Sequence, residues 1–141
     1  AMTARQHHDY PRAAALYDEY VQRREGYFEL TTFSILGRFH SIDSHVRAGA
    51  TVTTRTVQTA WDLFNRCGVV TTSGRAASAT AIWLTTLDRR DLALRFLGWA
   101  THAHRESLAH YADTLVAFEL PTTVDEPPEP LEQLLDELDL V

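Results

Sequence analysis

Residues 53–75 change their periodicity part-way along, and this change constrains the fold more than any other feature of the chain. In the first part, TTRTVQTAWDLFNRC, the residues Val57, Trp61 and Phe64 follow one another at intervals of four and three. This spacing places them on one side of a helix. A threonine before the run and a glycine after it suit the two ends of a helix. The sequence therefore predicts an amphipathic helix over 54–67 with a polar outer face.

The residues after that glycine are β-branched and aromatic, in two runs: VVTTS at 69–73 and TAIWLTT at 80–86. Such runs favour strands, and the link between them, GRAAS, contains a glycine. The sequence predicts a hairpin with a basic loop over 73–79. Because the other segments show helical spacing, the predicted fold class is mainly α with one small antiparallel β-hairpin.

The chain divides into four predicted segments. An N-terminal helix lies in 1–30, and a domain over 31–87 contains two further helices, the helix 54–67 and the hairpin. The two further helices begin at Thr31 or Thr32 and at Ser41 or Asp43, and the second ends at Ala48. A long helix follows over 88–120. The tail, 121–141, joins the stiff linker DEPPEP to a short acidic helix with leucines on one side: Leu131, Leu134, Leu135 and Leu138.

Within the long helix, seven residues recur at alternating intervals of four and three, and we call them the seam: Leu97, Thr101, His104, Leu108, Tyr111, Leu115 and Phe118. A heptad-like pattern of this length is typical of paired helices. The seam predicts a two-fold homodimer.

Composition excludes several classes of protein. A chain of 141 residues with 45% hydrophobic and 23% charged residues suits one globular domain. No apolar run approaches the roughly 20 residues that span a bilayer, and no signal peptide opens the chain, so we expect a cytoplasmic protein. Cys67 is the only cysteine, which excludes an intrachain disulfide and a cysteine zinc cluster, and we interpret it as a small core residue.

The net charge of −6 is unevenly distributed. Residues 122–141 hold seven carboxylates and no basic residue, whereas residues 31–96 hold eight arginines against four aspartates. The middle of the chain is therefore basic, and the acidic tail masks it in the sum. A basic region of this kind favours a nucleic-acid partner.

The order of helices followed by a hairpin resembles the winged helix-turn-helix domain of transcriptional regulators. TTRTVQTAWDLFNRCGVV is similar to a recognition helix with the first wing strand, and TTSGRAASATAIWLTT to the wing and second strand. The connection GATVT, at 49–53, is longer than the turn usual in that family. The resemblance, over about 31–120, implies a dimeric regulator that binds double-stranded DNA, without catalysis or a cofactor, with the helix after the wing forming the dimer.

General chemistry supports the same interpretation. A helix fits the major groove, where arginine can bind guanine and glutamine can bind adenine with two hydrogen bonds. Arg55 would bind guanine and Gln58 would bind adenine in this way. Thr54 and Thr59 can bond phosphates or touch a thymine methyl group. Arg75, at the predicted wing tip, would enter a minor groove or hold a phosphate. With Arg66, the predicted DNA-binding residues are Thr54, Arg55, Gln58, Thr59, Arg66 and Arg75.

Four alternatives stay open. The polar face of 54–67 can be a solvated surface, or the domain can bind a protein instead of DNA. Arg105 and His110 match the Arg-x4-His pattern of HEPN ribonucleases, in which the pair serves RNA cleavage, although a hairpin is foreign to that all-helical fold. His102, Glu106 and His110 follow one another at four-residue spacing, at which two side chains can share a metal; we predict no metal site. No phosphate-binding loop, nucleophile motif or carboxylate pair indicates an enzyme.

The leucines of the acidic tail need burial, since a short lone helix is marginal in water. The tail can dock on its own chain, bind a protein partner or cover the basic surface. We expect it to pack against the body or a second subunit, with its carboxylates facing solvent.

Overall fold

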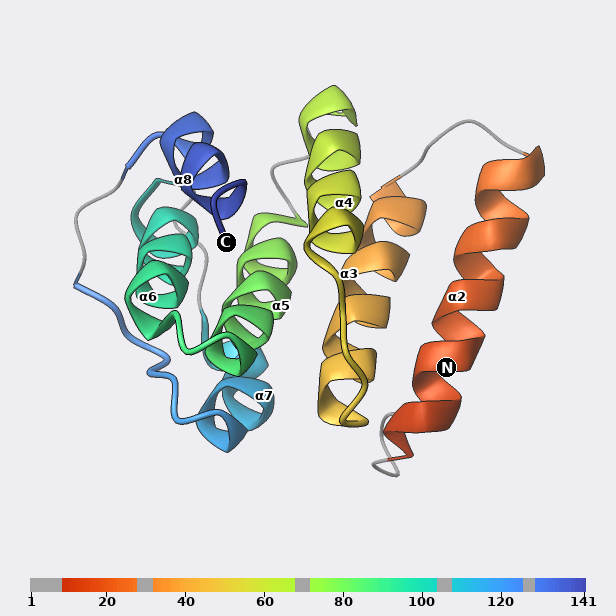
Figure 1. Ribbon diagram of the computed structural model, residues 1–141, viewed down its shortest axis with the longest axis horizontal. Helices are drawn as coiled ribbons and strands as arrows, with labels where there is room; N and C mark the ends of the chain where they lie inside the picture. Colours follow the sequence, from red (N-terminus) through yellow and green to blue (C-terminus); the bar gives the residue numbers. More distant parts are fainter. Residues whose placement is uncertain (1–8, 28–31, 68–71, 104–107, 126–128) are drawn as a thin grey trace. The chain divides into compact units, whose positions relative to one another are not determined.

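A computed structural model describes residues 9–27, 32–67, 72–103, 108–125 and 129–141, and within them every regular element is a helix (Figure 1). The predicted mainly α character is consistent with this structure, but the predicted β-hairpin is wrong. The chain forms two compact units, Ala1–Val69 and Val70–Val141. The boundary between them falls inside the segment 31–87 that was predicted to be one domain.

In the first unit, α2 (Tyr10–Tyr27) and α3 (Thr32–Arg47) lie side by side (Figure 1). Their contact is close because α3 has a glycine at Gly37, where an added Cβ would lie 3.0 Å from a methyl carbon of Val21. Two aromatic contacts join the helices further. The Tyr17 and His40 rings stack at 4.9 Å, and the Arg47 guanidinium lies 4.3 Å from the centre of the Tyr10 ring.

The two helices predicted over 31–48 are one continuous helix, α3. Serine and aspartate at 41 and 43 suggested a new helix start, because these residues commonly cap helices. In the structure Ser41 donates a hydrogen bond to Asp18 of α2, and Asp43 is fully buried. The Ser41 hydroxyl therefore joins α3 to α2 instead of beginning a new helix. Helix α3 ends at Arg47, one residue before the predicted end at Ala48. Gly49 follows in the turn with a φ of +81°, a conformation that glycine adopts readily.

Helix α4 (Thr54–Cys67) matches the predicted helix 54–67 and packs against α3. The backbone N–H of Thr56 donates to the Thr53 hydroxyl at 3.2 Å, so Thr53 is the N-cap. The predicted apolar stripe is buried, with Val57 and Trp61 at most 1% exposed. Gly68 lies outside the described residues.

In the second unit, the residues predicted as wing and second strand form a helix, α5 (Ser73–Thr86). Strand preference depends strongly on context, and here the helix gives partners to two buried hydroxyl groups and buries its small side chains. Ser78 and Thr80 donate to backbone carbonyls one turn earlier at 2.7 and 2.8 Å. The alanines of this helix are buried: Ala76, Ala77, Ala79 and Ala81. Gly74 serves close packing and not a turn, since an added Cβ would lie 2.8 Å from the Tyr111 ring.

The predicted long helix over 88–120 is interrupted. Its described parts are α6 (Arg90–Gly98), the π-helical turn η2 (Trp99–Ala103), the 3-10 turn η3 (Leu108–Tyr111) and α7 (Ala112–Ala117). All four pack with α5 or with one another. An uninterrupted helix would be about 50 Å long, more than twice the length of the 14-residue α5. The interruption lets leucines from both ends of the segment enter the same core.

The tail helix α8 (Leu131–Leu138) lies beside α6 (Figure 1). Leu134 and Leu138 are at most 1% exposed, so the expected packing of the tail against the body is confirmed. The expected orientation of its carboxylates is wrong in part, because two of them bind Arg95 of α6.

Candidate nucleic-acid interface

The outer face of α4 holds five of the six predicted DNA-binding residues. Arg55 and Arg66 are exposed, and three polar residues beside them are partly exposed: Thr54, Gln58 and Thr59. Arg55 and Arg66 are eleven residues apart, which is close to three helical turns. They therefore lie on the same side of α4, about 16 Å apart along its axis.

Neither of these two guanidinium groups forms an ion pair or hydrogen bond with another described residue. Asp62 lies on the same side of the helix, between them, and is exposed. The arginines of other elements differ, since Arg23 binds Glu19 at 2.6 Å and Arg89 binds Asp91 at 3.2 Å. The outer face of α4 thus offers two cationic groups whose hydrogen-bond donors are available to a ligand.

The core side of α4 fixes the direction of this face. The Trp61 ring meets the Phe39 ring of α3 edge to face, with centres 5.2 Å apart, and meets Phe64 in the same way at 5.1 Å. Aromatic pairs of this geometry contribute about 0.5–1.5 kcal/mol each beyond the burial of their surface. The helix cannot rotate about its axis without breaking the contact between Trp61 and Phe39, so its polar residues are held in one direction.

The sixth predicted residue, Arg75, belongs to a different helix. It lies in the first turn of α5, in the second unit, and its guanidinium is 4.5 Å from the centre of the Tyr111 ring. At this distance the cation is attracted to the ring face. The role of wing tip is therefore wrong for Arg75, because the wing is a helix and the side chain packs inside its own unit.

The seam residues lie mainly inside their own chain. Leu97, Leu108 and Leu115 are at most 1% exposed, and Thr101 donates to the Leu97 carbonyl at 2.9 Å. Tyr111 packs on Gly74, as described above. Phe118 is partly exposed and lies beyond the end of α7. His104 lies outside the described residues. Self-association through this segment stays a prediction.

The alternative catalytic and metal residues are only partly described. Arg105 and Glu106 lie outside the described residues, as do the side chains of His110 and Cys67. The His102 ring nitrogen lies 2.6 Å from the Val124 carbonyl oxygen and so joins η2 to the first residues of the tail. Among the described residues, no cluster of three or more histidine, cysteine or carboxylate side chains could bind a metal ion.

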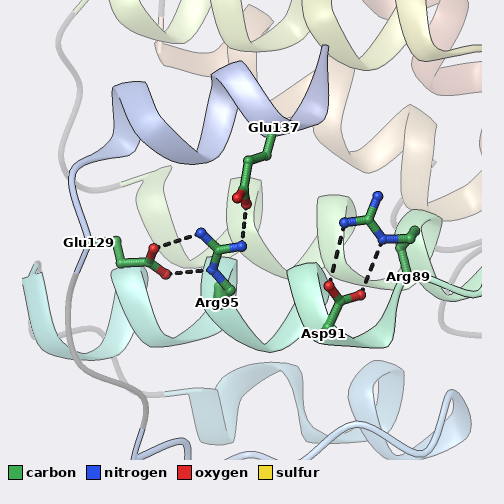
Figure 2. Close-up of polar contacts among 5 residues, drawn as sticks. All are labelled: Arg89, Asp91, Arg95, Glu129 and Glu137. Carbon is green, nitrogen blue, oxygen red and sulfur yellow. Dashed lines mark hydrogen bonds and ion pairs between the residues drawn. The ribbon is translucent and has the colours of Figure 1, made fainter. Parts of the chain in front are cut away.

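Sequence reasoning missed the ion pairs that hold the tail, which Figure 2 shows. Arg95 donates from Nε and Nη2 to the two carboxylate oxygens of Glu129, at 2.7 and 2.6 Å, and from Nη1 to Glu137. We call these three residues the Arg95 clasp. Hydrogen bonding to Glu129, and then to Glu137, raises the pKa of Arg95. The hydrogen bond from Arg95 in turn lowers the pKa of Glu129, although burial opposes this shift. No local spacing indicates partners 34 and 42 residues away.

A polar network between α2 and α3 was also missed. Oδ1 of Asp18 accepts from the Ser41 hydroxyl, and Oδ2 lies 2.8 Å from Nε2 of His45. Since a carboxylate only accepts hydrogen bonds, Nε2 carries the proton. Ser41 and His45 are four residues apart and so share one side of α3. The four-residue spacing of Ser41 and His45 is visible in the sequence, but nothing there identifies Asp18 as their partner.

The two units differ in net charge. Residues 1–69 contain eight arginines and seven carboxylates, whereas residues 70–141 contain five arginines and twelve carboxylates. The unit that includes α4 therefore has a charge of +1 and the other unit has −7.

Comparison with known proteins found no match to a family model, a curated protein or a solved structure. In the described part of the chain, every helix is too short or too polar to cross a membrane.

Proposed function

We propose that the chain binds double-stranded DNA through the outer face of α4, without a wing. The observation that carries the proposal is the pair Arg55 and Arg66. Both are exposed, they lie on one side of a firmly packed helix, and neither is paired with a described residue. A helix of this kind fits the major groove of DNA, and the residues of its first turns reach the base edges.

The polar residues of α4 suit distinct contacts with the groove. Arg55 offers two donors to guanine, and Gln58 offers a donor and an acceptor to adenine. Thr54 and Thr59 suit phosphates or thymine methyl groups, and Arg66 suits a phosphate at the far end of the helix. Asp62 would repel a phosphate but can accept a hydrogen bond from cytosine. A carboxylate among the contacts favours selective over indiscriminate binding.

Salt dependence tests the electrostatic part of this proposal. Each phosphate that the protein neutralises lowers the slope of log K against log salt by about 0.9. With only Arg66 placed on a phosphate, we expect a slope of about −1, which is modest. The proposal therefore requires base contacts to supply most of the discrimination.

Fluorescence anisotropy with duplexes selected from a random pool is the decisive assay. We expect Arg55→Ala to lose about 1–3 kcal/mol of specific binding and to relax one base position. Arg66→Ala should weaken all sequences alike and reduce the salt slope by about one unit. Arg23→Ala on α2 is the matched control, since it removes an equal charge from an exposed residue of the same unit. If all three variants fold and bind DNA equally well, the outer face of α4 does not contact DNA and the proposal is refuted.

A second candidate, cleavage of RNA by Arg105 and His110, gains support from the all-helical described structure. The predicted hairpin was the structural objection to a HEPN-like ribonuclease, and that hairpin is a helix in the structure. Incubation with a labelled structured RNA tests this candidate. Cleavage by the wild type that His110→Ala and Arg105→Ala both abolish would favour it over DNA binding, and intact RNA would exclude it.

A further inference from the structure

Asp62 is the only acidic residue in the sequence of α4. It follows Arg55 by seven residues and precedes Arg66 by four, which is close to two helical turns and one turn. All three therefore lie along one line on the helix surface. The buried side chains of Val57 and Phe64 face the opposite direction. A partner that covers both arginines therefore also covers Asp62.

The carboxylate of Asp62 has acceptor capacity to offer such a partner. Its side chain is exposed and forms no hydrogen bond or ion pair with another described residue. Removing a charged group from water is costly unless hydrogen bonds replace the lost water. The phosphates of DNA are negatively charged and supply no donor. When DNA covers this face, the carboxylate must therefore find its donor on the edge of a base.

The four bases differ in what they offer to a carboxylate. In the major groove only cytosine and adenine carry a donor, which is their amino group, whereas guanine and thymine present acceptors. The amino group of adenine lies beside the acceptor N7, which repels a carboxylate. Cytosine presents its amino group without an acceptor of its own. Cytosine is thus the base that satisfies Asp62 with the least repulsion.

We propose that Asp62 determines the sequence specificity of the DNA site by selecting cytosine at one position, an inference that rests on the proposed function. Asp62 lies about 10 Å from Arg55 along the helix axis. Since successive bases of a strand are about 3.4 Å apart, the cytosine lies about three base pairs from the guanine that Arg55 contacts. The carboxylate thereby rejects most sequences that two arginines alone would accept.

Selection of duplexes from a random pool, run in parallel with the wild type and with two variants, tests this role. The wild type should bind a duplex with cytosine roughly tenfold or more tightly than duplexes with the other three bases at that position. Asp62→Asn should shift the preference to adenine, because asparagine offers adenine both a donor and an acceptor. Asp62→Ala should lose the preference at this position and keep the guanine preference of Arg55. Both variants change an exposed side chain and should fold.

Glu19→Gln is the matched control, since it removes an equal charge from an exposed side chain of the same unit. It should leave the cytosine preference unchanged. If the wild type selects no duplex, both DNA binding and the role of Asp62 are refuted. If the wild type selects duplexes but Asp62→Asn selects the same base at every position, the role of Asp62 alone is overturned. Equal tightening of all duplexes by Asp62→Asn and Glu19→Gln would also overturn it, because Asp62 would then act only through its charge.

Discussion

Removing the arginine of the Arg95 clasp should release the tail helix. The side chains of Arg95 and Glu129 are each 22% exposed, and the side chain of Glu137 is 36% exposed. Exposed ion pairs contribute about 0–1 kcal/mol, whereas breaking a buried pair costs about 3–5 kcal/mol. Because this group is mostly buried but reaches solvent, we expect Arg95→Ala to lower the free energy of unfolding by about 2 kcal/mol.

The loss should concentrate in α8, which is eight residues long and depends on its contacts with α6. Hydrogen exchange measured by mass spectrometry should show faster exchange over 129–141, and urea denaturation gives the global value. Arg89→Ala is the matched control, since Arg89 lies immediately before α6 and pairs with Asp91, whose side chain is 66% exposed. Its cost should be at most about 1 kcal/mol. Equal costs for the two variants, or unchanged exchange over the tail, would refute the clasp as the tail's anchor.

Acid should have the same effect as Arg95→Ala. The pKa of Glu129 is lowered in the folded chain from a reference value of 4.5. A carboxyl with a lowered folded pKa stabilises the fold above its unfolded pKa, and this contribution is lost as the pH falls through the folded pKa. Arg95 stays protonated throughout, because its pKa is raised. Relative to the intrinsic exchange rate, exchange of the tail should therefore become faster as the pH falls below about 4.5. In Glu129→Gln the tail should exchange fast already at neutral pH and gain no further acceleration in acid. Wild-type tail exchange with no such acid dependence would contradict this linkage.

Three further changes test the packing. Leu108→Glu buries a charge at a side chain that is 1% exposed, and we expect loss of the cooperative thermal transition; a folded variant with half the wild-type mass in light scattering would instead support the seam as a dimer interface. Gly74→Ala forces the Tyr111 ring to move and should cost about 1–3 kcal/mol in urea denaturation. Thr53→Ala removes the cap of α4 and should cost about 0.5–2 kcal/mol, whereas Thr53→Asn should keep most of the stability.

The sequence determined the elements whose own periodicity was sufficient. Helix α4 lies where the stripe of Val57, Trp61 and Phe64 predicted it, and α8 buries two of the four leucines that predicted its packing. In both segments the polar and apolar residues separate onto two sides of a helix. That pattern is local, because it depends only on residues three or four positions apart.

Tertiary structure decided the remainder, for identifiable physical reasons. The run TAIWLTT is equally compatible with a strand and with a buried helix, since almost every position is apolar or β-branched. Its surroundings resolve the choice, because α5 is covered by α6, η2, η3 and α7. The regular spacing of the seam likewise predicted one long helix, but burial of Leu97, Leu108 and Leu115 around the shorter α5 required an interruption.

The polar sites depended on the fold even more strongly. The ion-pair partners of Arg95 lie 34 and 42 residues further along the chain, and the hydrogen-bond partners of Asp18 lie 23 and 27 residues away. Each of these residues is ordinary in its local sequence. Their chemistry arises only when helix packing brings the charges together and removes part of the water around them. The sequence thus determined which faces of α4 and α8 are apolar, whereas the tertiary structure decided which charges meet.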